Sequence, residues 1–467
     1  MLILLASAMC VCLALGYALP PGTGHSAATE LNGWELSMVI TGICGGLLRF
    51  AGRKASASHM LRKDAMGIVG IGWLVCSVFA ALPYLFCEPR LNLAQALFES
   101  VSGLTTTGAS AFSDLAPLPK TVLLWRSLTQ WLGGMGILAM FVLVSSSLGA
   151  GGKSLFRNES SMHAHEALGS SMRRSARWLW LLYIALTLIC IIGLRLCGMT
   201  IFQAVNHAMA TVSTGGFGTE NASVDNFNSA IKIWIILFML ACGISFPLYL
   251  SLYQKKRRWL ALRSHEEVLA YLSIALVASL GLIIGRAAAG NFAETWFTES
   301  LDTVFNVVSI ITSTGFVVGD YNAWPALAKE VILVLMIIGG CAGSTAGGLK
   351  VGRIILLFKI LRSEIQRAYR PNLVMTHRMN GRPLSAGSRG QLLAVFASAT
   401  IAAAIGSYLF VALEPDKSAL GCATAVVSAL SNSGPAFVDF GPTLGFSGLS
   451  APGMILLSLL MILGRLE

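Results

Sequence analysis

The chain has 467 residues, of which 55% are hydrophobic and only 12% charged, and its mean hydropathy is +0.72. Soluble domains carry roughly 25% charged residues, so this composition excludes a soluble protein and indicates an integral membrane protein. The net charge of +11 would suit nucleic-acid binding in a soluble protein. Here the basic residues lie between long apolar runs, so we predict no nucleic-acid partner and assign the charge to membrane topology. The alternative is that some of this charge also docks a partner or anionic lipid.

Ten apolar runs follow one another along the chain. A helix of about 20 residues crosses the hydrocarbon core of a bilayer, so these runs are the candidate membrane spans. The first run lacks the basic region and cleavage site of a signal peptide, which favours a spanning helix. The runs cover residues 2–19, 34–52, 66–86, 121–148, 175–197, 229–253, 267–288, 329–360 and 390–413, and a tenth that begins near 452 and meets the chain end at Glu467 before it completes a span.

Lys and Arg are concentrated on one side of the predicted membrane. Four segments, 49–63, 153–177, 255–263 and 350–389, hold 24 of the 33 basic residues. Loops rich in Lys and Arg face the cytoplasm. With ten spans, this pattern places both termini on the cytoplasmic side, and the parity agrees at every loop.

Four further apolar segments of about 13 residues lie between alternate spans on the outer side, at 92–104, 200–212, 297–312 and 418–430. Segments of this length are too short to cross and are more often re-entrant or buried. A glycine turn and then the next span follow each of them. Non-helical backbone at membrane depth is tolerated only where protein or a water-filled cavity satisfies it, so the unit of span, re-entrant helix, turn and span predicts a repeated pore element.

We therefore predict an all-α integral membrane fold, in which four pseudo-symmetric repeats surround a central ion pore and two transmembrane helices precede them. The predicted boundaries are 1–60 for the N-terminal pair, 61–155 for the first repeat, 156–262 for the second, 263–375 for the third with an intramembrane gating loop, and 376–467 for the fourth, whose last helix is incomplete.

The four turns are the candidate cation filter, with glycines 107, 100 and 119 positions apart. Glycine permits positive φ, so successive carbonyls can face one axis, and four carbonyl-bearing loops build cation filters. The preceding helices direct their negative ends at the cavity. Close helix packing by small residues would explain one such turn but not four in matching positions. The predicted filter residues are Thr106, Thr107, Gly108, Ser213, Thr214, Gly215, Ser313, Thr314, Gly315, Asn432, Ser433 and Gly434.

The run at 329–360 is interrupted by small residues from Gly339 to Lys350. Such residues should break the helix at mid-membrane, where a lysine is costly and by default functional. We predict a gate beneath the filter, with Arg465 as a pore-facing electrostatic barrier. The alternatives are a packing loop with Lys350 snorkelling to the cytoplasmic edge, and an Arg465 near the inner interface. The predicted gate residues are Gly343, Ser344, Thr345, Gly347, Gly348, Lys350 and Arg465.

The remaining polar residues are weaker candidates for ion binding or catalysis. Glu99, Glu299 and Asp302 lie in the short segments, where orienting backbone groups is the favoured role over binding ions. The sequence contains no Ser/His/Asp, Cys/His or metal-ligand constellation that would support catalysis, so we do not predict an enzyme.

The turns TTTGAS (105–110), STGGFGTEN (213–221), TSTGF (312–316) and NSGPAF (432–437), together with GGCAGSTAGGLKVGR (339–353), resemble the TrkH/Ktr/HKT superfamily of potassium transporters. The resemblance covers essentially the whole chain, and the two additional N-terminal spans favour its bacterial Trk branch. The fourth turn departs from the pattern because Asn432-Ser433 replaces the Thr of the others.

This resemblance implies potassium uptake across the bacterial inner membrane by a homodimer with one pore per subunit. It also implies a cytoplasmic TrkA-type regulatory subunit that binds ATP, ADP or NAD(H), so we expect nucleotide only on that partner. The metal at the filter residues would be the transported K⁺. An ion-coupled symporter, which carries H⁺ or Na⁺ with K⁺, is the alternative.

Overall fold

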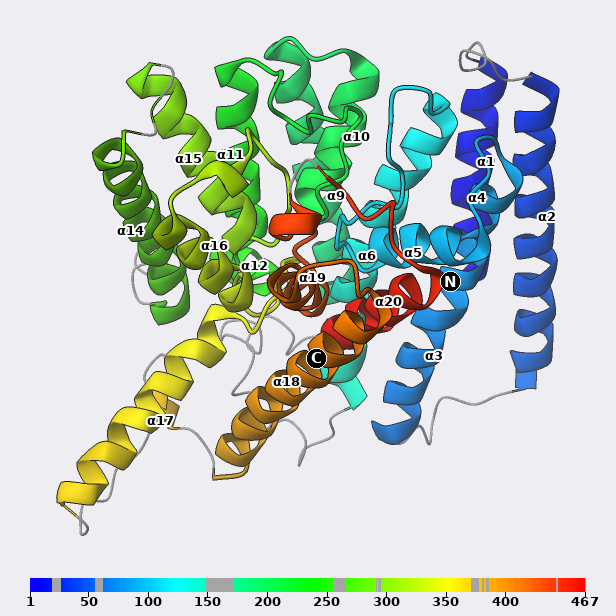
Figure 1. Ribbon diagram of the computed structural model, residues 1–467. Coiled ribbons are helices and arrows are strands. Elements are labelled where there is room, and N and C mark those ends of the chain that lie inside the picture. Colours follow the sequence, from blue (N-terminus) through cyan, green and yellow to red (C-terminus); the bar gives the residue numbers. More distant parts are fainter. Residues whose placement is uncertain are drawn as a thin grey trace.

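The computed structural model describes residues 1–18, 27–54, 62–147, 172–254, 265–290, 292, 295–370, 378–379, 382–383, 386–441 and 444–466. Helices dominate these ranges (Figure 1). Their only sheet is a two-residue antiparallel pair, β1 (Arg378–Met379) with β2 (Arg382–Pro383). The predicted all-α fold is therefore confirmed.

The helices appear in the predicted order. An N-terminal pair comes first, and four sets follow that each contain a long helix, a short helix and a second long or broken helix. The pair is α1 (Leu2–Ala18) and α2 (Ala27–Ala51), which the short η1 (Gly52–Lys54) follows. The first set is α3 (Arg62–Ala80), α4 (Leu82–Phe86), α5 (Leu93–Leu104) and α6 (Lys120–Ser147), and the second is α9 (Met172–Leu196), α10 (Ile201–Val212), α11 (Ser229–Cys242) and α12 (Phe246–Gln254). The third is α14 (Glu266–Ala288), α15 (Trp296–Ile311), η3 (Tyr321–Ala323), α16 (Ala326–Ile338) and α17 (Val351–Tyr369), and the fourth is α18 (Ala386–Leu413), α19 (Ala419–Ser431), η4 (Val438–Phe440) and α20 (Ala451–Arg465).

Several helices carry the length and surface of membrane spans. Five described segments are long and apolar enough to cross a bilayer: Leu31–Ala51, Gly67–Phe86, Ala176–Leu196, Glu266–Ala288 and Arg389–Leu413. Between 11% and 39% of the most apolar 18-residue stretch in each segment is buried within the protein. Apolar surface of this extent is rare on soluble proteins, and here the lipid chains of the membrane would cover it.

Two of the predicted spans are broken where the sequence suggests continuous helices. The run at 66–86 divides at Ala81, because Pro83 lies at the start of α4, where a missing N–H is tolerated. The run at 229–253 divides at Gly243, between α11 and α12. The predicted interruption of 329–360 is present as the segment between α16 and α17.

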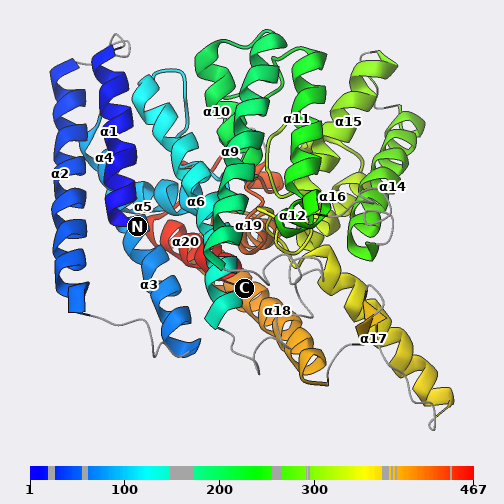
Figure 2. The same ribbon diagram turned by 180° about the vertical axis from the view of Figure 1, so that it is seen from behind.

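Each of the four short helices packs against the second long helix of the set before it. In this way α6 packs on α10, α11 on α15, α16 on α19, and α20 returns to α5. The last contact joins the fourth set to the first, so the arrangement is a closed ring. Figure 2 shows the same helices from behind, with α1 and α2 together at one edge and α17 extending away from the others.

Aromatic packing attaches the N-terminal pair to the first set. Trp34 of α2 and Trp125 of α6 are fully buried, and their rings meet edge-to-face with centroids 5.7 Å apart. The Trp125 indole N–H also donates to the carbonyl of Ala80 at 3.1 Å. Such an aromatic pair contributes about 1 kcal/mol beyond its buried area, so the pair is part of the first set's core.

Candidate ion-conduction site

Each short helix leads directly into its turn through one repeated hydrogen bond. The backbone N–H two residues past the C-cap of the first three helices returns to a carbonyl five residues earlier in the chain. A residue in left-handed conformation precedes this N–H, and a glycine with positive φ follows it. The bonds are Thr107 to Ser102, Gly215 to Ala210, Thr314 to Ser309 and Ser433 to Ser428, at 2.8–3.0 Å.

These hydrogen bonds show that the second turn corresponds to the other three one residue further along the chain than the sequence suggested. The left-handed positions are Thr106, Thr214, Ser313 and Asn432, with φ between 51° and 55°, and the following positive-φ glycines are Gly108, Gly216, Gly315 and Gly434. The prediction that Gly215 is equivalent to Gly108 is therefore wrong. Gly216 occupies that position, whereas Gly215 corresponds to Thr107, Thr314 and Ser433.

The four turns meet one another around an axis. A Cβ added to Gly108 would lie 2.2 Å from the carbonyl oxygen of Gly215. The same close approach recurs from Gly216 to Thr314 (2.0 Å), from Gly315 to Ser433 (2.4 Å) and from Gly434 to Thr107 (2.5 Å). A side chain at any of these glycines would therefore displace the carbonyl of its neighbour. The contacts run from each turn to the next and close from the fourth to the first.

A cavity of about 130 Å³ adjoins this ring on the side where the chain leaves the turns. Gly108, Gly216, Gly315 and Gly434 all line it. The Glu220 carboxylate also lines it and accepts hydrogen bonds from the amides of Gln203 (3.1 Å) and Asn226 (3.2 Å).

An aspartate lies next to the mouth of this cavity, outside the predicted spans. The Asn221 amide donates to Asp114 at 2.6 Å, and this hydrogen bond lowers the pKa of the Asp114 carboxyl. Asp114 is therefore ionised at neutral pH and adds negative charge beside the mouth.

Polar side chains of the short helices hold the segments that leave the turns. In α5, buried Glu99 accepts the Ala111 N–H at 2.7 Å and pairs with Arg126, also at 2.7 Å. At the matching position of α15, the Asn306 amide donates to the carbonyl of Val318 (2.7 Å) and accepts its N–H (3.2 Å). Glu99 thus orients backbone, as the sequence favoured, whereas the corresponding role of Asn306 was missed.

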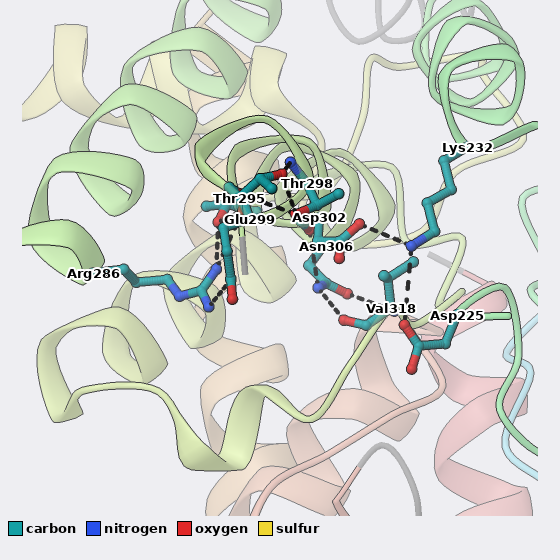
Figure 3. Close-up of polar contacts among 10 residues, drawn as sticks. Asp225, Lys232, Arg286, Thr295, Thr298, Glu299, Asp302, Asn306 and Val318 are labelled. Carbon is teal, nitrogen blue, oxygen red and sulfur yellow. Dashed lines mark hydrogen bonds and ion pairs between the residues drawn. The ribbon is translucent and has the colours of Figure 1, made fainter. Parts of the chain in front are cut away.

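The N-terminal half of α15 carries two ion pairs to neighbouring helices (Figure 3). Glu299 meets Arg286 of α14 at 2.7 Å, and Asp302 meets Lys232 of α11 at 3.0 Å. Lys232 also lies 4.0 Å from Asp225, which follows the second turn. These acids therefore fix the third short helix to its neighbours.

The segment from Gly339 to Lys350 lies against the ring. The Gly347 N–H donates to the hydroxyl of Ser313 in the third turn. The Thr345 hydroxyl donates to the carbonyl of Val212, the last residue of α10, at 3.2 Å. A Cβ at Gly347 would lie 2.1 Å from the carbonyl oxygen of Ser431. The loop thus contacts three of the four sets at the C-terminal ends of their short helices.

The other predicted gate residues lie in or beside this loop. Gly343 accepts the N–H of Phe246 through its carbonyl at 3.0 Å, and Ser344 is buried, with its hydroxyl on the carbonyl of Cys341. Gly348 approaches Gly339 closely, with φ +79°. Lys350, half-buried with φ +68°, donates to the carbonyl of Ala346 in the same loop. Its ammonium group therefore turns back toward the loop.

Arg465 joins the loop to the first turn. Its side chain is buried, and its Nη2 donates both to the hydroxyl of Thr106 (2.6 Å) and to the carbonyl of Thr345 (2.8 Å). Asn432 of the fourth turn lies nearby, with its amide on the Thr107 hydroxyl at 3.0 Å. The structure thus brings members of the predicted filter and gate sets into direct contact.

A closed ring of helices with re-entrant turns defines a membrane transport protein. The chain matches the family model of the TrkH cation transport proteins over residues 35–284 and 297–467. It is 32% identical to the Trk system potassium uptake protein TrkH of Escherichia coli K12 over 431 residues, 91% of this chain and 87% of that protein. It is 34% identical to TrkI of Halomonas elongata over 402 residues, 85% and 80% of the two chains.

The crystal structure of the potassium transporter TrkH from Vibrio parahaemolyticus superposes with a TM-score of 0.88. The match covers 100% of this chain and 94% of that one at 28% identity. The chain belongs to the TrkH family. The sequence resemblance, the fold with four repeats and the assignment to transport rather than enzymes are thereby confirmed.

Proposed function

We propose that this protein takes up potassium ions across the bacterial inner membrane through a filter formed by the four turns. The main support for this proposal is that the four turns contact one another in a closed ring. In this ring the carbonyls of Thr107, Gly215, Thr314 and Ser433 occupy equivalent positions. Four such carbonyls can replace part of an ion's hydration shell. Potassium as the ion is supported by the relatives, which are named as potassium uptake proteins.

The loop from Gly339 to Lys350 serves in this proposal as the gate. Support comes from its place beside the ring, where Arg465 and Thr345 connect it to the first turn. A loop held by a few hydrogen bonds can move without unfolding a helix, and Arg465 adds a positive charge that opposes a resting cation.

The proposal also includes the assembly of the protein and its regulation by a partner. The resemblance implies a homodimer and a TrkA-type cytoplasmic subunit that binds ATP, ADP or NAD(H), with both termini in the cytoplasm. The relatives' designation as parts of a Trk system agrees with a partner complex. The repeat boundaries 61–155, 156–262, 263–375 and 376–467 belong to the same proposal.

Rubidium flux into liposomes that contain the purified protein tests this function. We expect Rb⁺ uptake that K⁺ inhibits strongly and Na⁺ weakly, driven by the ion's own gradient. Gly315→Val should abolish selective uptake, because its Cβ alone would approach the Ser433 carbonyl oxygen to 2.4 Å and φ is +80°. Flux no greater than in protein-free liposomes would contradict the function, and normal selectivity in Gly315→Val would contradict the filter assignment.

A further inference from the structure

The second turn carries two consecutive glycines, and the conformation of its backbone explains only one of them. Thr214 and Gly216 have the positive φ angles of this turn, 53° and 79°. Gly215 lies between them at the position where the other turns have Thr107, Thr314 and Ser433. Its lack of a side chain therefore requires another cause.

The cause is the side chain of Gln130, which α6 contributes from the first set. A Cβ at Gly215 would lie 2.4 Å from Cδ, 2.6 Å from Oε1 and 2.8 Å from Nε2 of Gln130, and these are its three nearest atoms. Gln130 is fully buried. Its amide occupies the space that the threonine or serine side chain takes up in the other turns.

Both ends of this amide bind the second turn. Nε2 donates to the Gly215 carbonyl oxygen at 2.6 Å, and Oε1 accepts the N–H of Phe217 at 3.1 Å. The Gly215 oxygen is one of the four equivalent carbonyls of the ring. Within the described part of the chain, no side chain donates to the carbonyls of Thr107, Thr314 or Ser433. The ring therefore has one carbonyl that differs from the other three.

We propose that Gln130 is a positioning residue that sets the discrimination between K⁺ and Na⁺ by holding the Gly215 carbonyl. This inference rests on the proposed function. The donated hydrogen bond fixes the direction of the carbonyl and draws on its electron density. A carbonyl that is held in place and has a weaker field cannot close around the smaller Na⁺ ion, and both cavity size and field strength govern such selectivity.

Two variants separate the two contacts of the amide. Gln130→Met removes both contacts at similar volume. Gln130→Glu keeps an oxygen for the Phe217 N–H but cannot donate to the Gly215 carbonyl when it is ionised. In liposomes we expect both variants to lower the Rb⁺ over Na⁺ preference about fivefold, since a hydrogen bond contributes roughly 1 kcal/mol, while their Rb⁺ flux stays above that of protein-free liposomes.

A double-mutant cycle tests the pairing of Gln130 with Gly215. Gly215→Ala places a methyl group against the amide and should reduce the preference as Gln130→Met does. In a Gln130→Ala background the space is open, so Gly215→Ala should cause no additional loss. Thermal stability in detergent, measured alongside, identifies variants that fail to fold. Gln391→Met in α18, a half-buried glutamine outside the ring, is the matched control and should behave as wild type.

The result that overturns the inference is an unchanged ion preference in folded Gln130→Met and Gln130→Glu, or losses that add fully in the cycle. The proposed function would survive that result, because Rb⁺ flux would persist. If the wild-type protein carries no Rb⁺, the proposed function fails first, and the inference falls with it.

Discussion

At the scale of single residues, each turn combines an unusual backbone conformation with a close contact between its glycine and the carbonyl of the next turn. Thr106, Thr214, Ser313 and Asn432 adopt left-handed φ, a conformation that is common for Gly and tolerated by Asn but seldom adopted by Thr or Ser. Conformations of this kind persist only where the surroundings over-determine them. Here the hydrogen bonds back to the short helices supply that constraint, so the fold itself holds the carbonyls of the turns in place.

Arg465 gives the first residue-scale prediction. Its guanidinium holds Thr106 and Thr345 together and places a positive charge near the ring. At ~10 Å and an effective dielectric constant of ~20, one charge opposes a cation by about 1.7 kcal/mol. Arg465→Met should therefore raise Rb⁺ flux in liposomes about 17-fold, since 1.36 kcal/mol is tenfold in rate, and Arg465→Lys, which keeps the charge, should raise it less. Equal or lower flux in Arg465→Met would argue against a barrier.

At the scale of elements, the short helices begin where local capping signals place them. Asn92 and Gln95 form a capping box at the start of α5, and Thr200 and Gln203 form another at α10. An N-cap contributes about 1 kcal/mol, and these signals are visible in the sequence. The predicted segment 92–104 accordingly differs from α5 at one end by a single residue, the cap itself.

The break at Gly243 lacks such a signal. One glycine in an apolar run does not by itself end a helix. The tertiary structure breaks it, because the Gly243 carbonyl accepts the N–H of Cys341 at 2.9 Å and the Gly343 carbonyl accepts that of Phe246 at 3.0 Å. Contacts with the loop thus replace the lost bonds within the helix, as backbone at membrane depth requires.

The loop between α16 and α17 provides the element-scale prediction. Shortening 339–348 should raise Rb⁺ flux, because the loop could no longer reach the underside of the ring. Gly347→Ala should act in the same direction without a deletion, since its Cβ would meet the Ser431 carbonyl oxygen at 2.1 Å. Gly281→Ala in α14 is a matched control, because its Cβ meets no atom within 4 Å. Unchanged or lower flux in both loop variants would count against a gate.

At the scale of the whole molecule, stability depends on the joints between consecutive sets. The chain that leaves the second turn meets the chain that leaves the third: Val224 N–H donates to the Val317 carbonyl at 3.2 Å. The ion pair of Lys232 with Asp302 lies at the same joint (Figure 3). Each set therefore relies on its neighbour for the position of its turn.

That joint gives a stability prediction. Removing one partner of a buried ion pair costs about 3–5 kcal/mol. The side chain of Asp302 remains 25% exposed, so we expect Lys232→Met to cost less, about 2 kcal/mol, as a lower melting temperature in detergent. Asp302→Asn should give a similar loss, and the double variant should lose less than the sum. Fully additive losses would show that the pair is not coupled. Lys417→Met, before α19, is the control.

The local sequence was sufficient for much of this architecture. Hydropathy and length predicted where the long helices and the four short helices lie, because apolar runs and helix caps depend on residues close together in the chain. The small residues from Gly339 to Gly348 likewise predicted the interruption between α16 and α17.

The tertiary structure decided the rest. In the second turn, Gly216 rather than Gly215 matches Gly108, and the missing side chain at Gly215 makes room for Gln130, which is 85 residues away in the chain. The joining of Arg465 to both the first turn and the loop depends on residues 359 and 120 positions distant. Helix period and hydropathy carry no information about such contacts, because packing of the four sets alone brings these atoms within reach of one another.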